Sequence, residues 1–333
     1  MNILVTGGAG YIGSHVVKEL IEKEKNHTIT IIDNLSTGEA KTIQALQKLS
    51  DNVKFVNKNL SDWTQIDEIL KENNFDAIIH FAASLVVPES LDNPMKYYLN
   101  NTVNSINLIS LCNKHNINKF IFSSTAAVYG EPNACDIPVK ETTTTSPINP
   151  YGQSKLFVEK ILIDNAQSNK NFKYVILRYF NVAGASMDGI IGQNTKNATH
   201  LIKVAAQTAL KKRDKMYIFG DTYDTKDGTC IRDYIHIEDL SNAHILSLKY
   251  LKNNPSDIFN VGYGKGFSVK EVIQTMKDIS KNDFTVEVEN KREGDPEILI
   301  SNNEKITTLL KWKPKYDDLK IICETSLKWE SKI

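Results

Sequence analysis

Short apolar runs alternate with longer amphipathic stretches along the first half of the chain. The apolar runs are typical of strands, and they fall at residues 3–5, 29–32, 53–57, 77–81, 120–123 and 175–178. Amphipathic stretches between them, such as 14–25 and 101–115, indicate helices. Alternating strands and helices build βαβ units, whose strands lie parallel with helices on both faces. The pattern therefore predicts an α/β fold with a doubly wound (Rossmann) parallel sheet.

The alternation of apolar runs and amphipathic stretches becomes less regular after about residue 181. Residues 188–197 are rich in Gly, Asn and Asp and predict a loop, as does the polar segment 221–228. The other predicted elements are a helix at 201–212, strands at 215–219 and 232–236, a helix at 238–252, and helix, strand and helix in the tail from residue 268. We therefore expect a second, smaller region of mixed α/β structure.

Charge balance narrows the classes of partner. The chain has 333 residues, with 40 Lys and Arg and 40 Asp and Glu, so its formal net charge is +0. This balance removes the usual electrostatic argument for binding nucleic acid or an anionic membrane. No apolar run approaches the roughly 20 residues that a membrane-spanning helix needs, and the N-terminus shows no signal-peptide pattern.

The four cysteines are scattered, at positions 112, 135, 230 and 323, without a Cys-x-x-Cys pair or a neighbouring His cluster. Scattered cysteines favour reduced thiols in a cytoplasmic protein over disulfides or zinc. We therefore predict a cytoplasmic location and no metal site.

A glycine loop follows the first predicted strand. Gly7, Gly10 and Gly13 are spaced three apart and precede an amphipathic stretch, the context that distinguishes a dinucleotide fingerprint from a glycine-rich turn without a ligand. Such glycines permit close approach of the backbone to a pyrophosphate at the start of a helix. Asp33 ends the second strand, where an acidic residue binds ribose hydroxyls and favours NAD over NADP; the alternative is a turn residue.

A second candidate is the pair Tyr151 and Lys155, which lie one helical turn apart. Asn149 as N-cap and Pro150 at the first helical position predict a helix start just before them. The helix dipole and the lysine charge both favour the phenolate, so we expect a tyrosine pKa below its usual value of about 10. Such a tyrosine is suited to proton transfer, although the four-residue pattern alone is also compatible with an ordinary surface tyrosine.

Hydroxyl residues end the strand at 120–123. Ser123, Ser124 and Thr125 lie at the carboxyl end of that strand, the edge of a parallel sheet where ligands bind. Thr125 is placed to hydrogen-bond a substrate hydroxyl and share its proton with Tyr151. The alternative is a capping or turn element.

Taken in order, these motifs resemble the extended short-chain dehydrogenase/reductases, and more narrowly the UDP-galactose (UDP-glucose) 4-epimerases. The resemblance covers essentially the whole chain. Besides the Tyr-Lys pair, it rests on Gly8-Ala-Gly-Tyr-Ile-Gly-Ser-His15, Asp33-Asn-Leu35, Ile79-His-Phe-Ala82, Tyr97-Tyr-Leu-Asn-Asn101, Leu177-Arg-Tyr-Phe-Asn181, Asp227-Gly-Thr229, Arg232-Asp-Tyr-Ile-His236 and Arg292-Glu-Gly-Asp295.

The resemblance implies a site in three parts. Tyr151 is expected to be the acid/base for the sugar 4-hydroxyl, Thr125 its hydrogen-bonding partner, and Lys155 the residue that holds the nicotinamide ribose. The residues expected to bind NAD are Gly7, Gly10, Tyr11, Ile12, Gly13, Asp33, Asn34, Asn59, Leu60, Phe81, Ala82, Ala83, Asn100, Ser123, Tyr151, Lys155 and Phe180. Those expected to bind the UDP-hexose are Thr125, Tyr151, Asn181, His200, Leu201, Tyr217, Phe219, Arg232, Tyr234, Arg292, Asp295 and Leu299.

The two arginines suit a pyrophosphate, because guanidinium groups match phosphate oxygens. Three positions depart from the family pattern: Asn59 stands where relatives often have Asp, Leu85 where they often have Lys, and His200 where they often have Asn. These departures affect local contacts and leave the expected chemistry unchanged.

The expected reaction is a reversible, redox-neutral epimerisation at C4 through a transient 4-keto sugar. The first rival is a nucleotide-sugar 4,6-dehydratase, which needs an acid and a base after the threonine. Ala126 and Ala127 stand there and cannot transfer protons, which also argues against a UDP-glucuronate decarboxylase. The second rival, a non-catalytic NAD-binding sensor, has no need for the combination of Thr125, Tyr151 and Lys155.

Within this resemblance, Leu299 takes a position where relatives restricted to plain hexoses often have a bulky tyrosine. We therefore expect UDP-GlcNAc and UDP-GalNAc to be accepted beside UDP-glucose and UDP-galactose; the alternative is that Leu299 is ordinary core packing. The expected domains are an NAD-binding domain at 1–180 with 231–267 and a UDP-sugar-binding domain at 181–230 with 268–333. The resemblance also implies a homodimer through helices of the NAD-binding domain.

Overall fold

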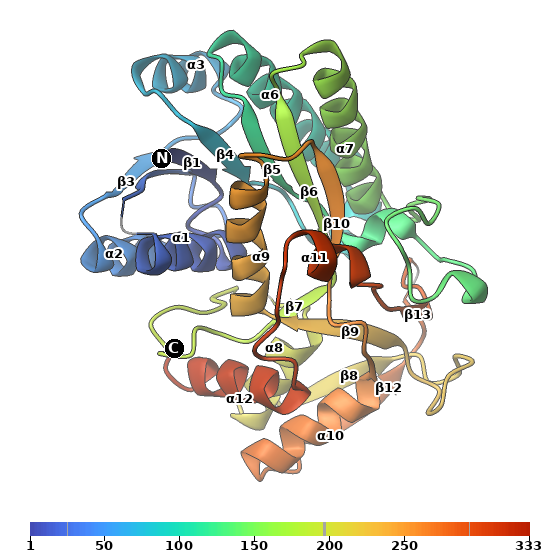
Figure 1. Cartoon of the computed structure of the whole chain (residues 1–333). Coiled ribbons are helices and arrows are strands. Elements are labelled where there is room, and N and C mark those ends of the chain that lie inside the picture. Colours follow the sequence, from blue (N-terminus) through green and yellow to red (C-terminus); the bar gives the residue numbers. More distant parts are fainter. Residues whose placement is uncertain (25, 196–197, 293) are drawn as a thin grey trace. The chain divides into compact units, whose positions relative to one another are not determined.

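The computed structural model describes residues 1–24, 26–195, 198–292 and 294–333 (Figure 1). The chain forms two compact units, each assembled from separate segments. Unit 1 comprises Met1–Val128, Pro147–Arg178 and Ser241–Phe259, and unit 2 comprises Tyr129–Ser146, Tyr179–Leu240 and Asn260–Ile333.

Unit 1 is built on a seven-stranded sheet in the order β10-β6-β5-β4-β1-β2-β3. Its strands are β1 (Asn2–Thr6), β2 (Thr28–Asp33), β3 (Val53–Asn57), β4 (Ala77–His80), β5 (Lys119–Ser123), β6 (Lys173–Tyr179) and β10 (Asp257–Val261). The strands from β6 to β3 pair in parallel. The order reverses between β1 and β4, which makes their carboxyl ends the switch point where such folds bind ligands. The predicted doubly wound fold is confirmed.

Helices cover both faces of this sheet. The helices of unit 1 are α1 (Tyr11–Lys23), α2 (Ala40–Leu49), α3 (Trp63–Glu72), α4 (Val87–Asp92), α5 (Pro94–Tyr97), the π-helix η1 (Tyr98–Val103), α6 (Asn104–Lys114), the 3-10 helix η2 (Ala126–Tyr129, which ends in unit 2), α7 (Pro150–Ser168) and most of α9 (Ile237–Tyr250). Figure 1 shows α3, α6 and α7 on one face and α1, α2 and α9 on the other. The buried cluster under α3, α6 and α7 includes Leu4, Phe120 and Leu162.

The described residues of unit 2 form two small sheets and three longer helices. In the larger sheet β9 (Ile231–His236) pairs with β7 (Asn181–Ala183), β11 (Gly266–Ser268) and β13 (Ile298–Leu299). In the smaller sheet β8 (Lys215–Phe219) pairs in parallel with β12 (Thr285–Glu289). The helices are α8 (Leu201–Ala209), α10 (Val269–Ser280), α11 (Glu304–Leu309), α12 (Leu319–Glu330) and the 3-10 helix η3 (Ala134–Asp136).

The units differ from the expected domains chiefly at residues 129–146, 231–240 and 260–267, all of which lie in unit 2. Tyr129–Ser146 belongs to unit 2, because Val139 exchanges backbone hydrogen bonds with Ile300 O at 2.9 Å and Asn302 N at 2.8 Å. Strand β9 also belongs to unit 2, because its partners β7, β11 and β13 all lie there. Both assignments depend on pairing between residues far apart in sequence, which the local pattern does not encode.

Local differences are smaller. The helix predicted at 101–115 is a π-helix up to Val103 and an α-helix only from Asn104, and the helix predicted at 201–212 ends at Ala209. The helix predicted at 14–25 begins three residues earlier, at Tyr11. Its last residue, residues 196–197 of the predicted loop and residue 293 of the arginine motif lie outside the described residues.

Candidate active site

Helix α7 begins where its sequence predicts, and its first turn lies against the chain that follows β5. The Asn149 side-chain oxygen caps the helix by accepting a hydrogen bond from Gly152 N at 2.8 Å. A Cβ at Gly152 would lie 2.7 Å from the Ala127 carbonyl oxygen, so only glycine permits this approach. The cap and the glycine together bring Tyr151 beside Thr125.

The three residues predicted to be catalytic meet at this point. Tyr151 is 9% exposed, and its hydroxyl is hydrogen-bonded to the Thr125 side chain. Lys155, one turn later, donates a hydrogen bond from Nζ to the Ser123 carbonyl oxygen at 2.9 Å. Its Nζ also lies 5.0 Å from the centre of the Phe122 ring. The structure therefore gathers a phenol, a hydroxyl and an amine at the carboxyl end of β5.

The electrostatics of this cluster differ from the expectation. Burial raises the pKa of Tyr151 above its usual value, and the hydrogen bond with Thr125 opposes that rise only in part. Burial also lowers the pKa of Lys155 to about 7, against the opposing field of the Glu159 carboxylate. The expected low tyrosine pKa is thus wrong for the chain by itself, because desolvation outweighs the helix dipole and a lysine that is only partly charged near neutrality.

The glycine loop connects β1 to α1 and leaves no room for a side chain at Gly7 or Gly13. Gly7 has φ 74°, and a Cβ there would lie 2.6 Å from Ala82 N. A Cβ at Gly13 would lie 2.4 Å from the Gly7 carbonyl oxygen. Gly10 is the N-cap of α1, whose first turn has no acidic residue. The loop therefore presents the start of a helix without a negative charge to oppose a phosphate.

Asp33 lies beside this loop, at the end of β2. Its carboxylate accepts hydrogen bonds from Ala9 N at 3.0 Å and Leu35 N at 2.8 Å, and burial raises its pKa. These two bonds use only half of the acceptor capacity of a carboxylate, so hydroxyl donors can still bind. The glycine loop, the helix start and Asp33 together fit a dinucleotide with a free ribose diol.

The other predicted cofactor residues of unit 1 differ in their contacts and in their exposure to solvent. Ala82 follows β4 and contacts Gly7, and Asn100 donates a hydrogen bond to Ser84 Oγ at 3.1 Å. Leu60 points into the hydrophobic core, so its side chain is unavailable to a ligand. The members that are partly or fully exposed are Tyr11, Ile12, Asn34, Asn59, Phe81, Ala82, Ala83 and Asn100.

Sequence reasoning missed one residue that meets this region from a distant part of the chain. His244 of α9 lies with Nε2 3.0 Å from Ser123 Oγ, and its ring centre is 4.9 Å from that of Phe81. It therefore links two predicted cofactor residues. No local motif marks His244, because the contact joins residues more than a hundred positions apart.

Unit 2 carries the residues predicted for the nucleotide, and one group of them lies along β9. Arg232 donates from Nη1 to the carbonyl oxygens of Ile231 at 3.0 Å and Glu297 at 3.1 Å. In the sheet, Asn181 of β7 is opposite Tyr234, and Leu299 of β13 is opposite Arg232. Backbone carbonyl groups thus hold the Arg232 guanidinium at the junction of β9 and β13.

A second group lies at the end of β8. The guanidinium carbon of Arg292 lies 3.4 Å from the centre of the Phe219 ring, which neighbours the Tyr217 ring at 6.3 Å. Partial burial lowers the pKa of Arg292, and the Asp295 carboxylate opposes that change. This arrangement presents a cation stacked on one aromatic ring.

The remaining predicted residues occupy separate positions in unit 2. His200 is exposed just before α8, which starts at Leu201, and its Nδ1 lies 3.1 Å from Gln193 Nε2. Phe180 is buried and donates from its backbone N–H to Val261 O at 3.2 Å. Phe180 is thus a predicted cofactor residue that belongs to unit 2, whereas the others belong to unit 1.

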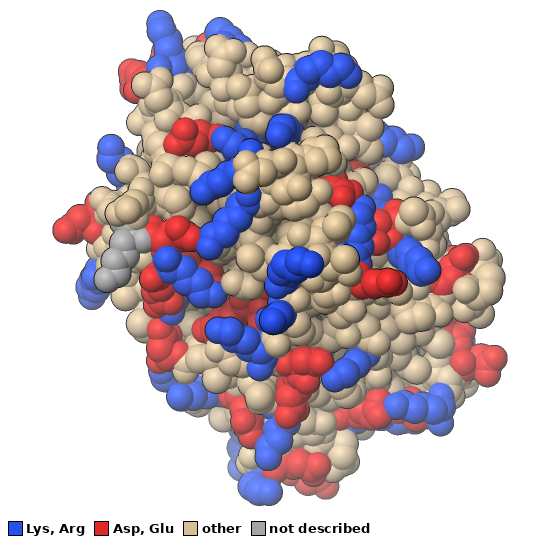
Figure 2. Space-filling view, in the orientation of Figure 1, with Lys and Arg blue, Asp and Glu red and all other residues tan. Residues whose placement is uncertain are grey.

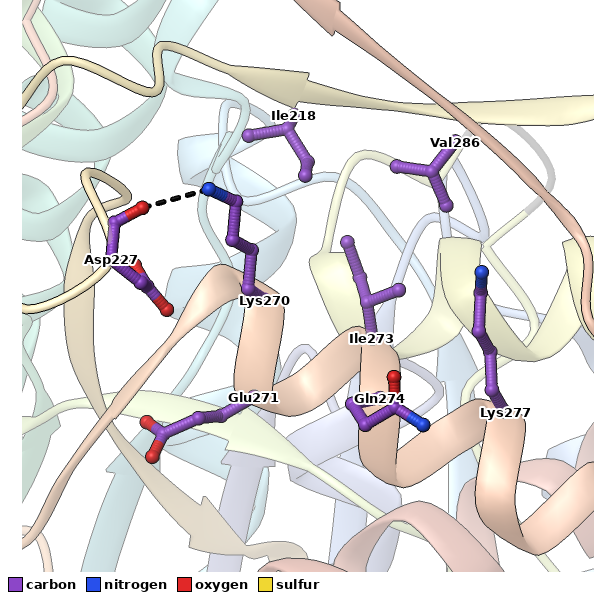
Figure 3. Close-up of a pocket in the computed structure, with 8 residues that line it drawn as sticks. All are labelled: Ile218, Asp227, Lys270, Glu271, Ile273, Gln274, Lys277 and Val286. Atoms are coloured by element: carbon purple, nitrogen blue, oxygen red, sulfur yellow. Dashed lines mark hydrogen bonds between the residues drawn. The ribbon is translucent and has the colours of Figure 1, made fainter.

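Neither the charge on the visible face nor the pocket of unit 2 marks the predicted site. In Figure 2, Lys and Arg are interspersed with Asp and Glu across the visible face. A pocket of about 460 Å³ lies in unit 2 between α10 and the β8–β12 pair (Figure 3), and none of the predicted site residues line it. Within the described ranges, no cluster of three His, Cys, Asp or Glu side chains is arranged to hold a metal. Nor, in that part of the chain, is any helix long and apolar enough to cross a membrane.

A glycine loop before a helix, an aspartate at the end of the next strand and a buried Tyr-Lys pair lie on one parallel sheet, an arrangement typical of nucleotide-dependent oxidoreductases. Residues 3–262 match the model of the NAD dependent epimerase/dehydratase family. Because this match spans most of the chain, the chain belongs to that family.

Several similar proteins within the family are UDP-hexose 4-epimerases by name. The chain is 45% identical to the UDP-glucose 4-epimerase of Azospirillum brasilense, over 98% of this chain and 91% of the relative. It is 54% identical to the UDP-Glc/GlcNAc 4-epimerase of Campylobacter jejuni, with a TM-score of 0.87 and coverage of 100% and 99%. The UDP-glucose 4-epimerase of Bifidobacterium longum in complex with NAD⁺ and UDP is 34% identical, with a TM-score of 0.95 and coverage of 100% and 98%.

Proposed function

We propose that this chain is an NAD-dependent UDP-hexose 4-epimerase that interconverts UDP-glucose and UDP-galactose. The observation that carries the proposal is the hydrogen-bonded contact of Tyr151 with Thr125, with Lys155 one turn away at the end of β5. The family and the two full-length structural relatives named above support this reading.

Gly7, Gly10, Gly13, the start of α1 and Asp33 would hold NAD, with the pyrophosphate at the helix start and the ribose at the carboxylate. The chemistry that NAD supplies when bound is reversible hydride acceptance, together with a positive charge in its oxidised form. A positive charge favours the phenolate of a buried tyrosine, so it opposes the effect of burial on the Tyr151 pKa.

Tyr151 removes the proton of the sugar 4-hydroxyl as C4 is oxidised, and it returns the proton when C4 is reduced from the other face. Thr125 orients the hydroxyl and the phenol through its hydrogen bond. One proton and one hydride leave and return, so the overall reaction is redox-neutral. In this scheme the intermediate is a 4-keto sugar that turns before reduction.

Arg232 and Arg292 would bind the pyrophosphate of UDP, because charge-assisted hydrogen bonds to phosphate are strong and directional. Elimination chemistry is not supported: the helix η2, immediately after Thr125, begins with Ala126 and Ala127, which have no proton to transfer. The site therefore favours epimerisation over a 4,6-dehydratase reaction.

The sugar range is expected to include N-acetylated hexoses. Leu299 lies opposite Arg232 in the sheet and is 7% exposed, and a leucine leaves more room than a tyrosine at this position. The Campylobacter jejuni relative is named for both UDP-Glc and UDP-GlcNAc. Leu299→Tyr should therefore lose activity on UDP-GlcNAc while retaining it on UDP-glucose. Equal loss on both substrates would contradict a role in sugar selection.

We further propose a homodimer and a cytoplasmic location. Four large apolar side chains on α5, η1, α6 and α7 are exposed, namely Met95 at 59%, Leu99 at 61%, Ile106 at 42% and Phe157 at 39%. An apolar group of this kind on neighbouring helices suits a second copy of the chain. Light scattering with size-exclusion chromatography tests it, and a monomer at all concentrations would refute it. The four cysteines are free, which suits a reducing compartment.

The deciding experiment is an incubation of the purified protein with UDP-galactose, with UDP-glucose followed by proton NMR. A parallel incubation with UDP-GlcNAc tests the wider sugar range. Formation of UDP-glucose that requires bound NAD is the expected result. Bound NAD without any UDP-glucose would refute the epimerase and revive the NAD-binding sensor.

A further inference from the structure

A buried ion pair lies one turn beyond Lys155 on the same face of α7. Glu159 is 1% exposed, and its carboxylate accepts hydrogen bonds from Arg178, with Nη2 at 2.6 Å and Nε at 3.1 Å. The Glu159 carboxylate also accepts a hydrogen bond from the Ser124 hydroxyl. Arg178 lies on β6 and is 4% exposed. The expected active site leaves this charged group, and its contact with Ser124, unexplained.

Three consecutive residues at the end of β5, Ser123, Ser124 and Thr125, contact three consecutive turns of α7. Thr125 contacts Tyr151 in the first turn, Ser123 contacts Lys155 in the second, and Ser124 contacts Glu159 in the third. Ser124 is also fixed to β6, because its backbone N–H donates to Leu177 O at 2.9 Å. Glu159 therefore contacts the same short segment as Tyr151 and Lys155, the two residues of α7 that carry the predicted chemistry.

We propose that Glu159 is a positioning residue for the Tyr151–Lys155 pair: its carboxylate fixes Ser124 and favours the ammonium form of the buried Lys155. Arg178 pairs with the carboxylate, so that Glu159 is not a lone buried charge. This inference rests on the proposed function, in which Lys155 acts as a cation.

The charged and titratable groups near Lys155 come from three elements. On α7 these are Tyr151 and Glu159, and Arg178 of β6 pairs with Glu159. On β4, His80 is buried with its pKa lowered to about 3, partly by Lys155, so it is neutral at physiological pH. The charge that acts directly on Lys155 is that of Glu159, which favours the ammonium against the effect of burial. Removing it should therefore favour the neutral amine.

The test is the titration of Lys155 in the protein without substrate, read from the ¹³C shift of its Cε and assigned with Lys155→Met. Glu159→Gln keeps the size of the side chain and an oxygen that accepts from Ser124 but removes the charge. We expect the Lys155 midpoint to fall by about one pH unit or more. Because Glu159→Gln leaves Arg178 as a buried unpaired cation, the double variant Glu159→Gln/Arg178→Met is measured beside it.

The double variant should recover thermal stability relative to the single variant while retaining the lowered midpoint. A wild-type midpoint in the double variant would overturn the proposal and leave Glu159 as a structural ion pair only. Glu330→Gln is the matched control, because Glu330 also forms a buried ion pair, with Lys203 at 2.6 Å in unit 2, and should not move the Lys155 titration.

Turnover of UDP-galactose against pH supplies the second readout, and Glu159→Gln should lose activity at a lower pH than wild type. An inactive wild-type protein would refute the proposed function, whereas the NMR titration would still decide the role of Glu159. An active wild type with identical pH profiles for both proteins would refute this inference alone.

Discussion

The candidate residues of the two units differ in how deeply their charged groups are buried and in what holds them. In unit 1, Lys155 and Glu159 are buried, and their polar atoms are bonded to serines and to an arginine of the same unit. In unit 2, Arg232 and Arg292 are partly exposed and are held by backbone carbonyl groups or against an aromatic ring. The first group is enclosed, whereas the second still faces solvent.

This difference follows from the two tasks. Proton transfer requires a fixed distance and a tuned pKa, both of which burial supplies because it restricts rotamers and strengthens local fields. Binding a diphosphate requires cations that a charged ligand can reach from water, because a fully desolvated arginine would need a permanent partner. The following predictions test the buried charges of unit 1 and the partly exposed arginines of unit 2 separately.

The largest effect is expected from Tyr151→Phe. This change removes only the phenolic oxygen that contacts Thr125, so kcat for UDP-galactose should fall about 10²–10⁴-fold, the usual contribution of a general acid/base. Binding of UDP, measured by calorimetry, should be unchanged. Tyr250→Phe, on a partly exposed tyrosine of α9, is the control. Near-normal turnover of Tyr151→Phe would exclude the proposed acid/base.

A smaller effect of a different kind is expected in unit 2. Arg292→Met should weaken UDP binding about 10-fold or more, the usual contribution of one charge-assisted hydrogen bond, with little change in kcat. Arg232→Met should do the same and also lower thermal stability, because it removes the hydrogen bonds that the guanidinium donates to the carbonyl groups of Ile231 and Glu297. Arg213→Met is the control in the same unit. Unchanged UDP affinity in both variants would contradict the pyrophosphate assignment.

The third prediction concerns pH and unit 1. Burial lowers the folded-state pKa of Lys155 to about 7, below the unfolded value of about 10.4. Between these values the unfolded chain binds a proton that the folded chain lacks, so the free energy of unfolding should rise with pH by up to about 1.4 kcal/mol per pH unit. Denaturant unfolding of wild type minus Lys155→Met at pH 7, 8 and 9 isolates this contribution. A pH-independent difference would show that Lys155 is fully charged in the folded protein.

Local spacing was a reliable guide to much of the site. Asn149 and Pro150 predicted the start of α7 to the residue, and the glycine spacing predicted the turn from β1 into α1. These features depend on neighbours in the sequence and on backbone conformation, so they can be predicted without knowledge of the fold. The same holds for the parallel sheet, whose strands are short apolar runs separated by helices.

Other features had no local signal. His244 meets Ser123, and Glu159 meets Arg178 and Ser124, only because α9, α7 and β6 converge at the end of β5. The membership of Tyr129–Ser146 in unit 2 likewise depends on hydrogen bonds between Val139 and residues near 300. Such contacts join residues that are far apart in the sequence, so no local sequence pattern predicts them.

The sequence by itself determined the βαβ order, the glycine loop and the Tyr151–Lys155 pair, because each depends on residues within a few turns of one another. Only the tertiary structure decided the charges of that pair. Burial in the folded protein raises the pKa of Tyr151 and lowers the pKa of Lys155, and the buried Glu159 carboxylate opposes the change at Lys155. Desolvation is a property of the assembled core, so no motif encodes it.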